Sequence, residues 1–290
     1  MTVCIAGINH SNPQPFIIAA CDRKISFGGV DSAEGAMKIA GLNKDWTVMF
    51  SGPVSAMTAM IDAITERTER ARMMDARPFA RLCRQVYLEE RKPLLESEIL
   101  GEYDIEDYAE YMALRKVEPS FHQEIAKNIK EVEQYWSLLF AGFDKQRRAH
   151  IFTITECGKI RFYDRVGYAA IGSGEWQATL ALSAYSFRKN LDFSKAVFGI
   201  AAAKFAAEGA EGVGQETILT VLEPRTKRAP VFSEIRVENL REMWAELPRF
   251  PGNEAIDEIW KELNMFQQAG WLTKNRAPKP SISEKLAVKT

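Results

Sequence analysis

The chain has 290 residues, of which 46% are apolar and 27% charged, and this is the composition of a globular protein with a sizeable core. Its 38 basic and 39 acidic residues nearly cancel to a formal net charge of -1, which excludes the strongly basic character typical of proteins that bind nucleic acid or an anionic membrane. The N-terminus lacks the pattern of a signal peptide, and no apolar run approaches the roughly 20 residues of a membrane-spanning helix.

Residues 2–52 are predicted to form four strands in two hairpins. The short apolar runs TVCIAGI and PFIIAAC flank the polar turn NHSNPQ, and AMKIAGL and WTVMFSG flank a turn at Asn43, Lys44 and Asp45. After Pro53 the apolar residues recur at steps of three and four, which predicts amphipathic helices. The charged, weakly patterned segment 95–135 is expected to be a helical insertion.

Strand signals return in SLLFAGFD, AHIFTITE, KIRFYDRV and YAAIGSG. Two helices are predicted next, one from Glu175 and one over FSKAVFGIAAAKFAAEG, and TILTVLEP is predicted to be the last strand. Because strands and helices come in separate blocks, the pattern favours an α+β fold over alternating βαβ units. The order fits a four-layer α-β-β-α sandwich, in which two antiparallel sheets lie between two helix layers.

We expect three segments along the chain. Residues 1–232 would form the sandwich domain, including the insertion at about 95–135. Residues 233–275 would form a C-terminal helical extension. The tail 276–290 is polar and contains prolines, so we expect it to be disordered.

The four cysteines show no CxxC pair, and the three histidines add no zinc-ligand spacing. We therefore expect no metal or other cofactor. Unpaired thiols are typical of a reducing compartment, which predicts a cytoplasmic protein.

Thr2 lies directly behind the initiator methionine, at the head of the first predicted strand. A threonine hydroxyl is a weak nucleophile and needs an adjacent base. If Met1 is removed, the α-amine of Thr2 can be that base, because its ordinary pKa lies near neutral pH. The site would also need a cation, a carboxylate that holds the cation, and a backbone N–H that stabilises the oxyanion.

The same block of strands supplies candidates for these three groups. Asp22 and Lys38 each interrupt an apolar strand run, where an unpaired charge is costly, so pairing them beside Thr2 would relieve that cost. Gly52 ends a strand just before a helix, where free N–H groups are available to an anion. A structural ion pair without catalytic function is the alternative interpretation of Asp22 and Lys38.

At these residues the chain resembles the N-terminal half of a proteasome β-subunit, and in particular bacterial proteasome-related families of the N-terminal-nucleophile hydrolase superfamily. In AACDRKISFGG, Asp22 takes the place of the family aspartate, Lys24 that of an arginine and Ser26 that of a threonine. Lys38 and Gly52 follow at the family spacing. The resemblance covers roughly residues 2–225, apart from the insertion.

Two later segments bear on the same resemblance. YAAIGSG resembles the family segment whose serine lies beside the amine of the nucleophile, which implies that role for Ser173. The family aspartate and serine that precede the last strand have no counterpart in residues 208–214.

The resemblance implies that Thr2, Asp22, Lys38, Gly52 and Ser173 are catalytic. It also implies that substrate binds as an added strand near Ser26. The places that line the family's specificity pocket fall on Ile25, Ala36, Ala40, Phe50 and Val54. An apolar pocket with a bulky Phe50 predicts cleavage after small or medium apolar residues.

The expected function is therefore that of an N-terminal threonine hydrolase, a peptidase or amidase acting on a peptide or protein, with no nucleic-acid or membrane partner. The resemblance implies a homo-oligomeric ring or stack and leaves an unfoldase partner open. Two alternatives remain at this point. One is a catalytically silent scaffold or binding subunit, and the other is an amidase that acts on a small molecule.

Overall fold

The computed structural model describes residues 2–11, 14–27, 30–34, 37–69, 74–134, 136–224 and 231–246, with the backbone alone for 25–27 and 30–34. These residues belong to one compact unit spanning Met1–Phe250. The expected tail 276–290 and most of the expected extension 233–275 lie outside the described residues. The predicted domain boundaries stay predictions.

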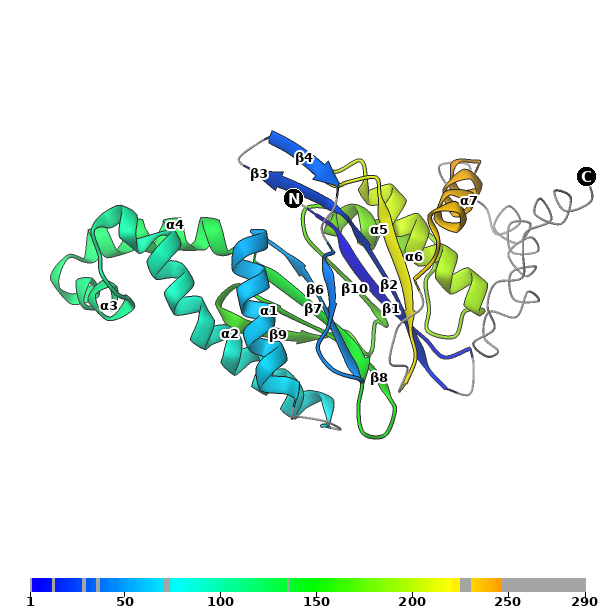
Figure 1. Cartoon of the computed structure of the whole chain (residues 1–290), viewed down its shortest axis with the longest axis horizontal. Helices are drawn as coiled ribbons and strands as arrows, with labels where there is room; N and C mark the ends of the chain where they lie inside the picture. Colours follow the sequence, from blue (N-terminus) through cyan, green and yellow to red (C-terminus); the bar gives the residue numbers. More distant parts are fainter. Residues whose placement is uncertain are drawn as a thin grey trace, which may run out of the picture. The chain divides into compact units, whose positions relative to one another are not determined.

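The first sheet contains the N-terminal strand at its centre (Figure 1). Its order is β10-β1-β2-β11, and every neighbouring pair is antiparallel. The strands are β1 (Cys4–Asn9), β2 (Phe16–Asp22), β10 (Tyr168–Ile171) and β11 (Thr217–Leu222). All residues of β1 and β2 are buried, which indicates that both faces of the central strands are covered.

The second sheet has the antiparallel order β5-β6-β7-β8-β9. Its strands are β5 (Ile39–Gly41), β6 (Trp46–Ser51), β7 (Ser137–Phe143), β8 (Ala149–Thr155) and β9 (Lys159–Phe162). Strand β6 precedes the long helical segment and β7 follows it, so the sheet pairs residues that are far apart in sequence. Met49 of β6 lies opposite Leu139 of β7.

The two sheets share one apolar cluster. Cys4, Ala6 and Ile8 of β1 pack in this cluster with Met49 and Leu139 of the second sheet. The remaining positions of β1 face the opposite side, because side chains alternate along a strand. A Cβ added at Gly7 would meet Phe187 and Ile200, so that side of the first sheet is closely packed as well.

The helices contact different sheets. α1 (Val54–Glu69) and α2 (Ala76–Glu98) contact strands of the second sheet, whereas α5 (Glu175–Ala184) and α6 (Phe193–Ala207) contact strands of the first. α7 (Glu234–Ala245) packs on α6 and β11. The structure is therefore an α+β sandwich of two antiparallel sheets with helices.

The segment 95–135 is helical in large part. It contains the end of α2, the short helix η1 (Leu100–Tyr103), α3 (Tyr108–Val117) and α4 (Pro119–Glu133). The Asp107 side chain accepts a hydrogen bond from the Glu110 amide and so caps α3.

The prediction of four strands in the first 52 residues was wrong in number. A further hairpin is formed by β3 (Lys24–Phe27) and β4 (Val30–Glu34), which pair only with each other among the described strands. The segment ISFGGVDSAEG has no long apolar run, because this hairpin is not part of either large sheet. The hydrophobic pattern of the sequence therefore gave little indication of the β3–β4 hairpin.

Candidate active site

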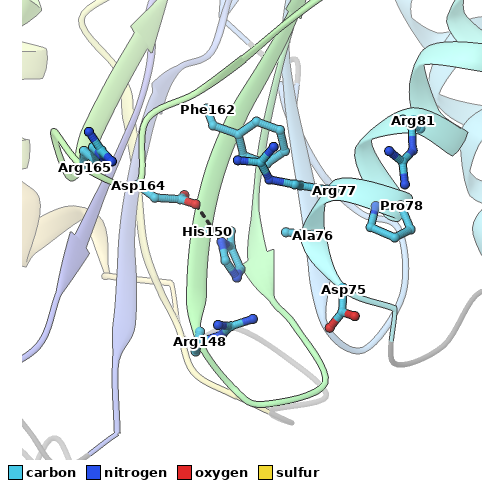
Figure 2. Close-up of a pocket in the computed structure, with 10 residues that line it drawn as sticks. All are labelled: Asp75, Ala76, Arg77, Pro78, Arg81, Arg148, His150, Phe162, Asp164 and Arg165. Atoms are coloured by element: carbon cyan, nitrogen blue, oxygen red, sulfur yellow. Dashed lines mark hydrogen bonds and ion pairs between the residues drawn. The ribbon is translucent and has the colours of Figure 1, made fainter.

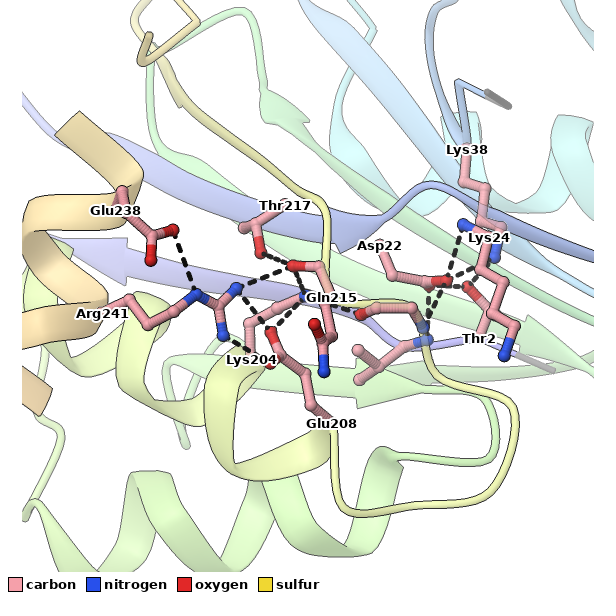
Figure 3. A network of polar contacts seen from close by, with 12 residues as sticks. Thr2, Asp22, Lys24, Lys38, Lys204, Glu208, Gln215, Thr217, Glu238 and Arg241 are labelled. Atoms are coloured by element: carbon pink, nitrogen blue, oxygen red, sulfur yellow. Dashed lines mark hydrogen bonds and ion pairs between the residues drawn. The ribbon is translucent and has the colours of Figure 1, made fainter. Parts of the chain in front are cut away.

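Thr2, Asp22 and Lys38 are brought together at one end of the first sheet (Figure 3). Thr2 directly precedes β1 and Asp22 is the last residue of the neighbouring β2. The antiparallel register sets Cys4 opposite Cys21, so the start of β1 lies beside the end of β2. The three polar residues are at most 3% exposed. The structure therefore brings these three residues together, and their catalytic roles stay a prediction.

The Lys38 ammonium joins the other two side chains. Its Nζ donates to Thr2 Oγ1 at 2.6 Å and to Asp22 Oδ2 at 2.8 Å. The Thr2 hydroxyl donates in turn to Asp22 Oδ1. A cation that contacts a hydroxyl oxygen stabilises negative charge on that oxygen, so this triangle is suited to hold Thr2 as a nucleophile.

Asp22 is the centre of the cluster. Besides Thr2 and Lys38, its carboxylate accepts from the backbone N–H groups of Val3 at 2.9 Å, Lys24 at 3.1 Å and Gly214 at 3.3 Å. An ionised carboxylate is acceptor-only and can take this many donors, which offsets the cost of burying its charge. Asp22 therefore ties together the first strand, the β3 hairpin and the loop before β11.

Ser173 lies at the backbone of Thr2. The Thr2 N–H donates to Ser173 Oγ at 3.2 Å, and the Ser173 hydroxyl is within hydrogen-bond distance of the carbonyl oxygens of Thr2 (3.2 Å) and Glu211 (3.3 Å). The Gly174 N–H also reaches the Thr2 carbonyl oxygen, at 3.3 Å. The nitrogen of Thr2 is thus oriented by the loop between β10 and α5.

Gly172 allows this loop to approach Thr2. Its φ of 97° lies in the left-handed region that favours glycine. A Cβ at this position would come within 2.3 Å of the Thr2 carbonyl oxygen. A side chain at Gly172 would therefore displace either the loop or Thr2.

The remaining predicted site residues are Gly52, Ser26 and those of the expected specificity pocket, and their relation to Thr2 is less well defined. Gly52 follows β6 in the turn before α1, and no hydrogen bond among the described residues joins it to Thr2. Phe50 is buried in an apolar cluster against which Ala40 and Val54 pack. Ile25 and Ser26 lie in β3, but their side chains are outside the description, and Ala36 lies outside the described residues.

The cysteines near the site are core thiols. Burial, followed by the neighbouring Cys21 thiol, raises the pKa of the Cys4 thiol well above its ordinary value. The Cys4 Sγ lies 3.3 Å from the Phe50 carbonyl oxygen, to which it donates. A thiol held in this protonated form is a poor nucleophile. Cys157 is exposed and unpaired, and the three other cysteines are buried and unpaired.

A second cluster of buried charge was missed by sequence reasoning. Lys204 of α6 is fully buried, and its Nζ donates to Glu208 and to the carbonyl oxygens of Gly214 and Gln215, both at 2.8 Å (Figure 3). Arg241 of α7 reaches the same Glu208 carboxylate and donates to Gln215 O at 2.7 Å. Burial lowers the pKa of Lys204, and Glu208 opposes that effect.

The Lys204 cluster supports the Thr2 site through the loop before β11. The loop held by Lys204 contains Gly214, whose N–H contacts Asp22. The signal in the sequence was a lysine inside the apolar run AAAKFAAEG with a glutamate four residues later, a pair that faces one side of a helix.

Within the described part of the chain, no group of three or more His, Cys, Asp or Glu side chains could hold a metal ion. No described helix is both long and apolar enough to cross a membrane.

Comparison with known proteins gives a fold and no family. No protein-family model and no curated protein matches the chain. One similar solved structure is a mutant of Anbu from Hyphomicrobium sp. strain MC1. It is 14% identical, has a TM-score of 0.60, and the match covers 96% of this chain and 100% of that one. An identity this low shows the fold alone.

The resemblance drawn from the sequence is corrected by these findings. Assignment to proteasome β-subunit-like N-terminal-nucleophile hydrolases was wrong as a statement of family, because no family model matches the chain and the structural match is only 14% identical. The comparison supports a fold similar to that of Anbu.

Proposed function

We propose that the chain is an N-terminal threonine hydrolase, a peptidase or amidase, whose nucleophile is Thr2 after removal of Met1. One observation carries the proposal. A buried ammonium, Lys38 Nζ, lies 2.6 Å from the Thr2 hydroxyl oxygen and is itself held by the Asp22 carboxylate. A cation this close stabilises negative charge on the hydroxyl oxygen, as a nucleophilic threonine requires.

The proposed reaction has two halves. The Thr2 hydroxyl oxygen attacks the substrate carbonyl carbon, and its proton passes to the free α-amine of Thr2. Collapse of the intermediate breaks the C–N bond, and the amine gives that proton to the leaving nitrogen. A water then attacks the resulting ester and transfers a proton to the α-amine. The second collapse returns a proton to Oγ1 and releases the carboxylic acid.

Each neighbour has a role in this scheme. Lys38 stabilises negative charge on the Thr2 oxygen, and Asp22 holds Lys38 in place. Ser173 orients the Thr2 nitrogen, a role supported by the 3.2 Å hydrogen bond between them. The Gly52 N–H is proposed to stabilise the oxyanion of the intermediate.

The proposed substrate is a peptide or protein bound as an added strand beside Ser26 and Gly52. Small or medium apolar side chains would enter a pocket lined by Ile25, Ala36, Ala40, Phe50 and Val54. The apolar surroundings of Phe50, Ala40 and Val54 support this preference. A panel of fluorogenic peptides cleaved best after arginine or aspartate would contradict it.

The proposal includes the wider architecture. We place the protein in the cytoplasm as a homo-oligomeric ring or stack, with an unfoldase as one candidate partner. The four-layer α-β-β-α order is also part of it, supported by the contacts of α1 and α2 with one sheet and of α5 and α6 with the other.

The experiment has two steps. Intact mass determines whether Met1 has been removed, and incubation with a β-lactone or an epoxyketone tests for a covalent adduct. We expect a Met1-free protein to form one adduct per chain, located on Thr2 by peptide mapping. Thr2→Ala should form none, whereas Thr65→Ala, which removes a helical hydroxyl elsewhere, should react like the parent protein.

A catalytically silent scaffold is the second candidate function. It is favoured by the 3% exposure of Thr2, which leaves substrate little access to the hydroxyl. A Met1-free, assembled protein that never forms an adduct would establish this alternative and rule out the hydrolase.

A further inference from the structure

A cavity of about 670 Å³ opens between the start of α2 and the strands β8 and β9, away from Thr2 (Figure 2). Its lining is strongly basic. The arginine side chains around it are Arg77, Arg81, Arg148 and Arg165, with His150 beside them, and we refer to this cavity as the arginine pocket. The volume lies within the range of small-molecule sites.

The arginines come from three separate segments. Arg77 and Arg81 lie in the first turns of α2, Arg148 comes just before β8, and Arg165 follows β9. Among the described residues, the side chains of Arg81 and Arg165 make neither an ion pair nor a hydrogen bond. The Arg77 guanidinium lies over the ring of Phe162, with its carbon 5.8 Å from the ring centroid. Their charges are therefore available to a ligand.

Two carboxylates also line the pocket, but both are engaged. Asp75 pairs with Lys145 at 2.8 Å. Asp164 contacts His150 Nδ1 at 2.8 Å and accepts from the Ile151 N–H at 3.1 Å. Arg148 is paired with Asp144 at 2.6 Å, whereas neither lining carboxylate is paired with Arg77, Arg81 or Arg165. These three guanidinium groups therefore carry the excess positive charge of the pocket.

The helix that opens into the pocket adds to the positive potential. α2 has 23 residues, and its first turn contains no acidic side chain. The side chain of Asp75, the residue before the helix, makes no capping hydrogen bond. The Asp75 carboxylate at the N-cap offsets part of the helix dipole, but it is paired with Lys145, so the helix N-terminus still adds to the positive potential of Arg77 and Arg81.

We propose that the arginine pocket binds a small oligophosphate, either free or as the phosphate chain of a nucleotide. Guanidinium groups bind phosphate oxygens through two parallel hydrogen bonds. A ligand that engages arginines from α2 and from the β8–β9 side at once must carry charge at more than one position. A chain of phosphates meets this requirement within a small volume, whereas a single anion does not.

The test is calorimetric titration of the full chain with inorganic tripolyphosphate, in buffer without phosphate. We expect saturable binding that weakens as salt is added. Arg77→Gln combined with Arg81→Gln should lower the affinity at least about tenfold, because hydrogen bonds to charged groups are lost. The matched control combines Arg115→Gln with Lys116→Gln, which removes two charges from the exposed surface of α3 and should bind like the parent protein.

Further titrations identify the ligand class and the source of the phosphates. Tighter binding of ATP than of tripolyphosphate would assign the pocket to nucleotides, and equal binding would assign it to the phosphate chain alone. Equal or tighter binding of citrate would overturn the phosphate assignment. No binding of tripolyphosphate, or the same affinity in both double variants, would overturn the site itself. Melting temperatures confirm that both variants are folded.

Discussion

Lys204 Nζ donates a hydrogen bond to the Gly214 carbonyl oxygen at 2.8 Å, and the amide of the same glycine donates to Asp22 at 3.3 Å. A single residue, Gly214, therefore links the buried Lys204 of α6 to the Asp22 carboxylate beside Thr2. The link is close packed, because a Cβ added at Gly214 would come within 2.6 Å of the Lys24 Cβ.

Replacing Lys204 should damage the fold and the site together. Lys204→Met leaves the Gly214 carbonyl oxygen without its buried donor, and Arg241 becomes the remaining cationic donor to Glu208 and to the Gln215 carbonyl oxygen. We therefore expect a loss of about 1–3 kcal/mol in the free energy of unfolding. Urea denaturation measures this loss. Arg241→Gln, which removes the partly exposed end of the same network, should cost less than half as much. An equal loss in the free energy of unfolding for the two variants would show that the burial of Lys204 does not determine its contribution to stability.

The sequence predicted the central strands and the triangle around Thr2 for a clear reason. Asp22 and Lys38 are charges inside apolar runs, and such residues need partners wherever the chain folds. The support from Lys204 carried a weaker signal. Its effect on Asp22 passes through backbone groups of Gly214, and that hydrogen bond spans 192 positions in the chain. Backbone hydrogen bonds between residues so far apart in sequence do not require a particular residue type, so the sequence does not reveal them.

The hairpin β3–β4 shows a different limit. Strand prediction from pattern depends on one buried face, and this hairpin pairs with neither large sheet. The same lack of pattern applies to the arginine pocket, whose four arginines are exposed residues spread from 77 to 165. The register of strand pairing and the clustering of surface residues are set only when the sheets assemble. The positions of the strands follow from the local hydrophobic pattern of the sequence.

The Asp22–Lys38 pair gives a second prediction. Lys38→Met would leave Asp22 buried with one cationic partner fewer, so we expect a loss of about 3–5 kcal/mol in the free energy of unfolding. Lys44→Met, at an exposed turn position, should change stability by less than about 0.5 kcal/mol. Chemical denaturation at neutral pH compares the two. A loss below about 1 kcal/mol for Lys38→Met would mean that the buried pair is dispensable for the fold.

Gly172 gives a third prediction, on the backbone near Thr2. Gly172→Ala forces a side chain into a left-handed conformation and against the Thr2 carbonyl oxygen, so we expect a loss of at least about 1–3 kcal/mol and slower reaction with a threonine-directed electrophile. Gly41→Ala is the control, because a Cβ there would meet no atom within 4 Å. Unchanged stability in Gly172→Ala would contradict the close approach of this loop to Thr2.

Self-association gives a fourth prediction. Trp176 and Leu180 of α5 are 77% and 65% exposed and lie four residues apart, on one side of the helix. If α5 lies at an interface between copies, Leu180→Glu should shift the mass measured by light scattering toward that of the monomer. Val117→Glu changes an equally exposed aliphatic residue of α3 and should leave the mass unchanged. Identical masses for the two variants would place the interface elsewhere.

His150 gives a prediction on pH. Burial acts to lower its pKa, but hydrogen bonds to Asp164 at 2.8 Å and Asp144 at 3.1 Å outweigh burial and raise the pKa. A raised pKa in the folded state means that the charged ring contributes stability fully below its ordinary pKa, near 6.5. This contribution is lost as pH rises through the folded pKa. Arg148 lowers the pKa of Asp144 against the effect of burial, so Asp144 stays ionised throughout this range.

The stability advantage of the parent protein over His150→Gln should therefore be largest near pH 6 and should narrow as the pH is raised above neutrality. Urea denaturation at several pH values, in buffer without phosphate, gives the comparison. Asp164→Asn removes one of the two carboxylates that hold the ring, so its own difference from the parent protein should narrow over the same range. A difference between the parent protein and His150→Gln that grows with pH would mean that burial, and not the two carboxylates, dominates the environment of the ring.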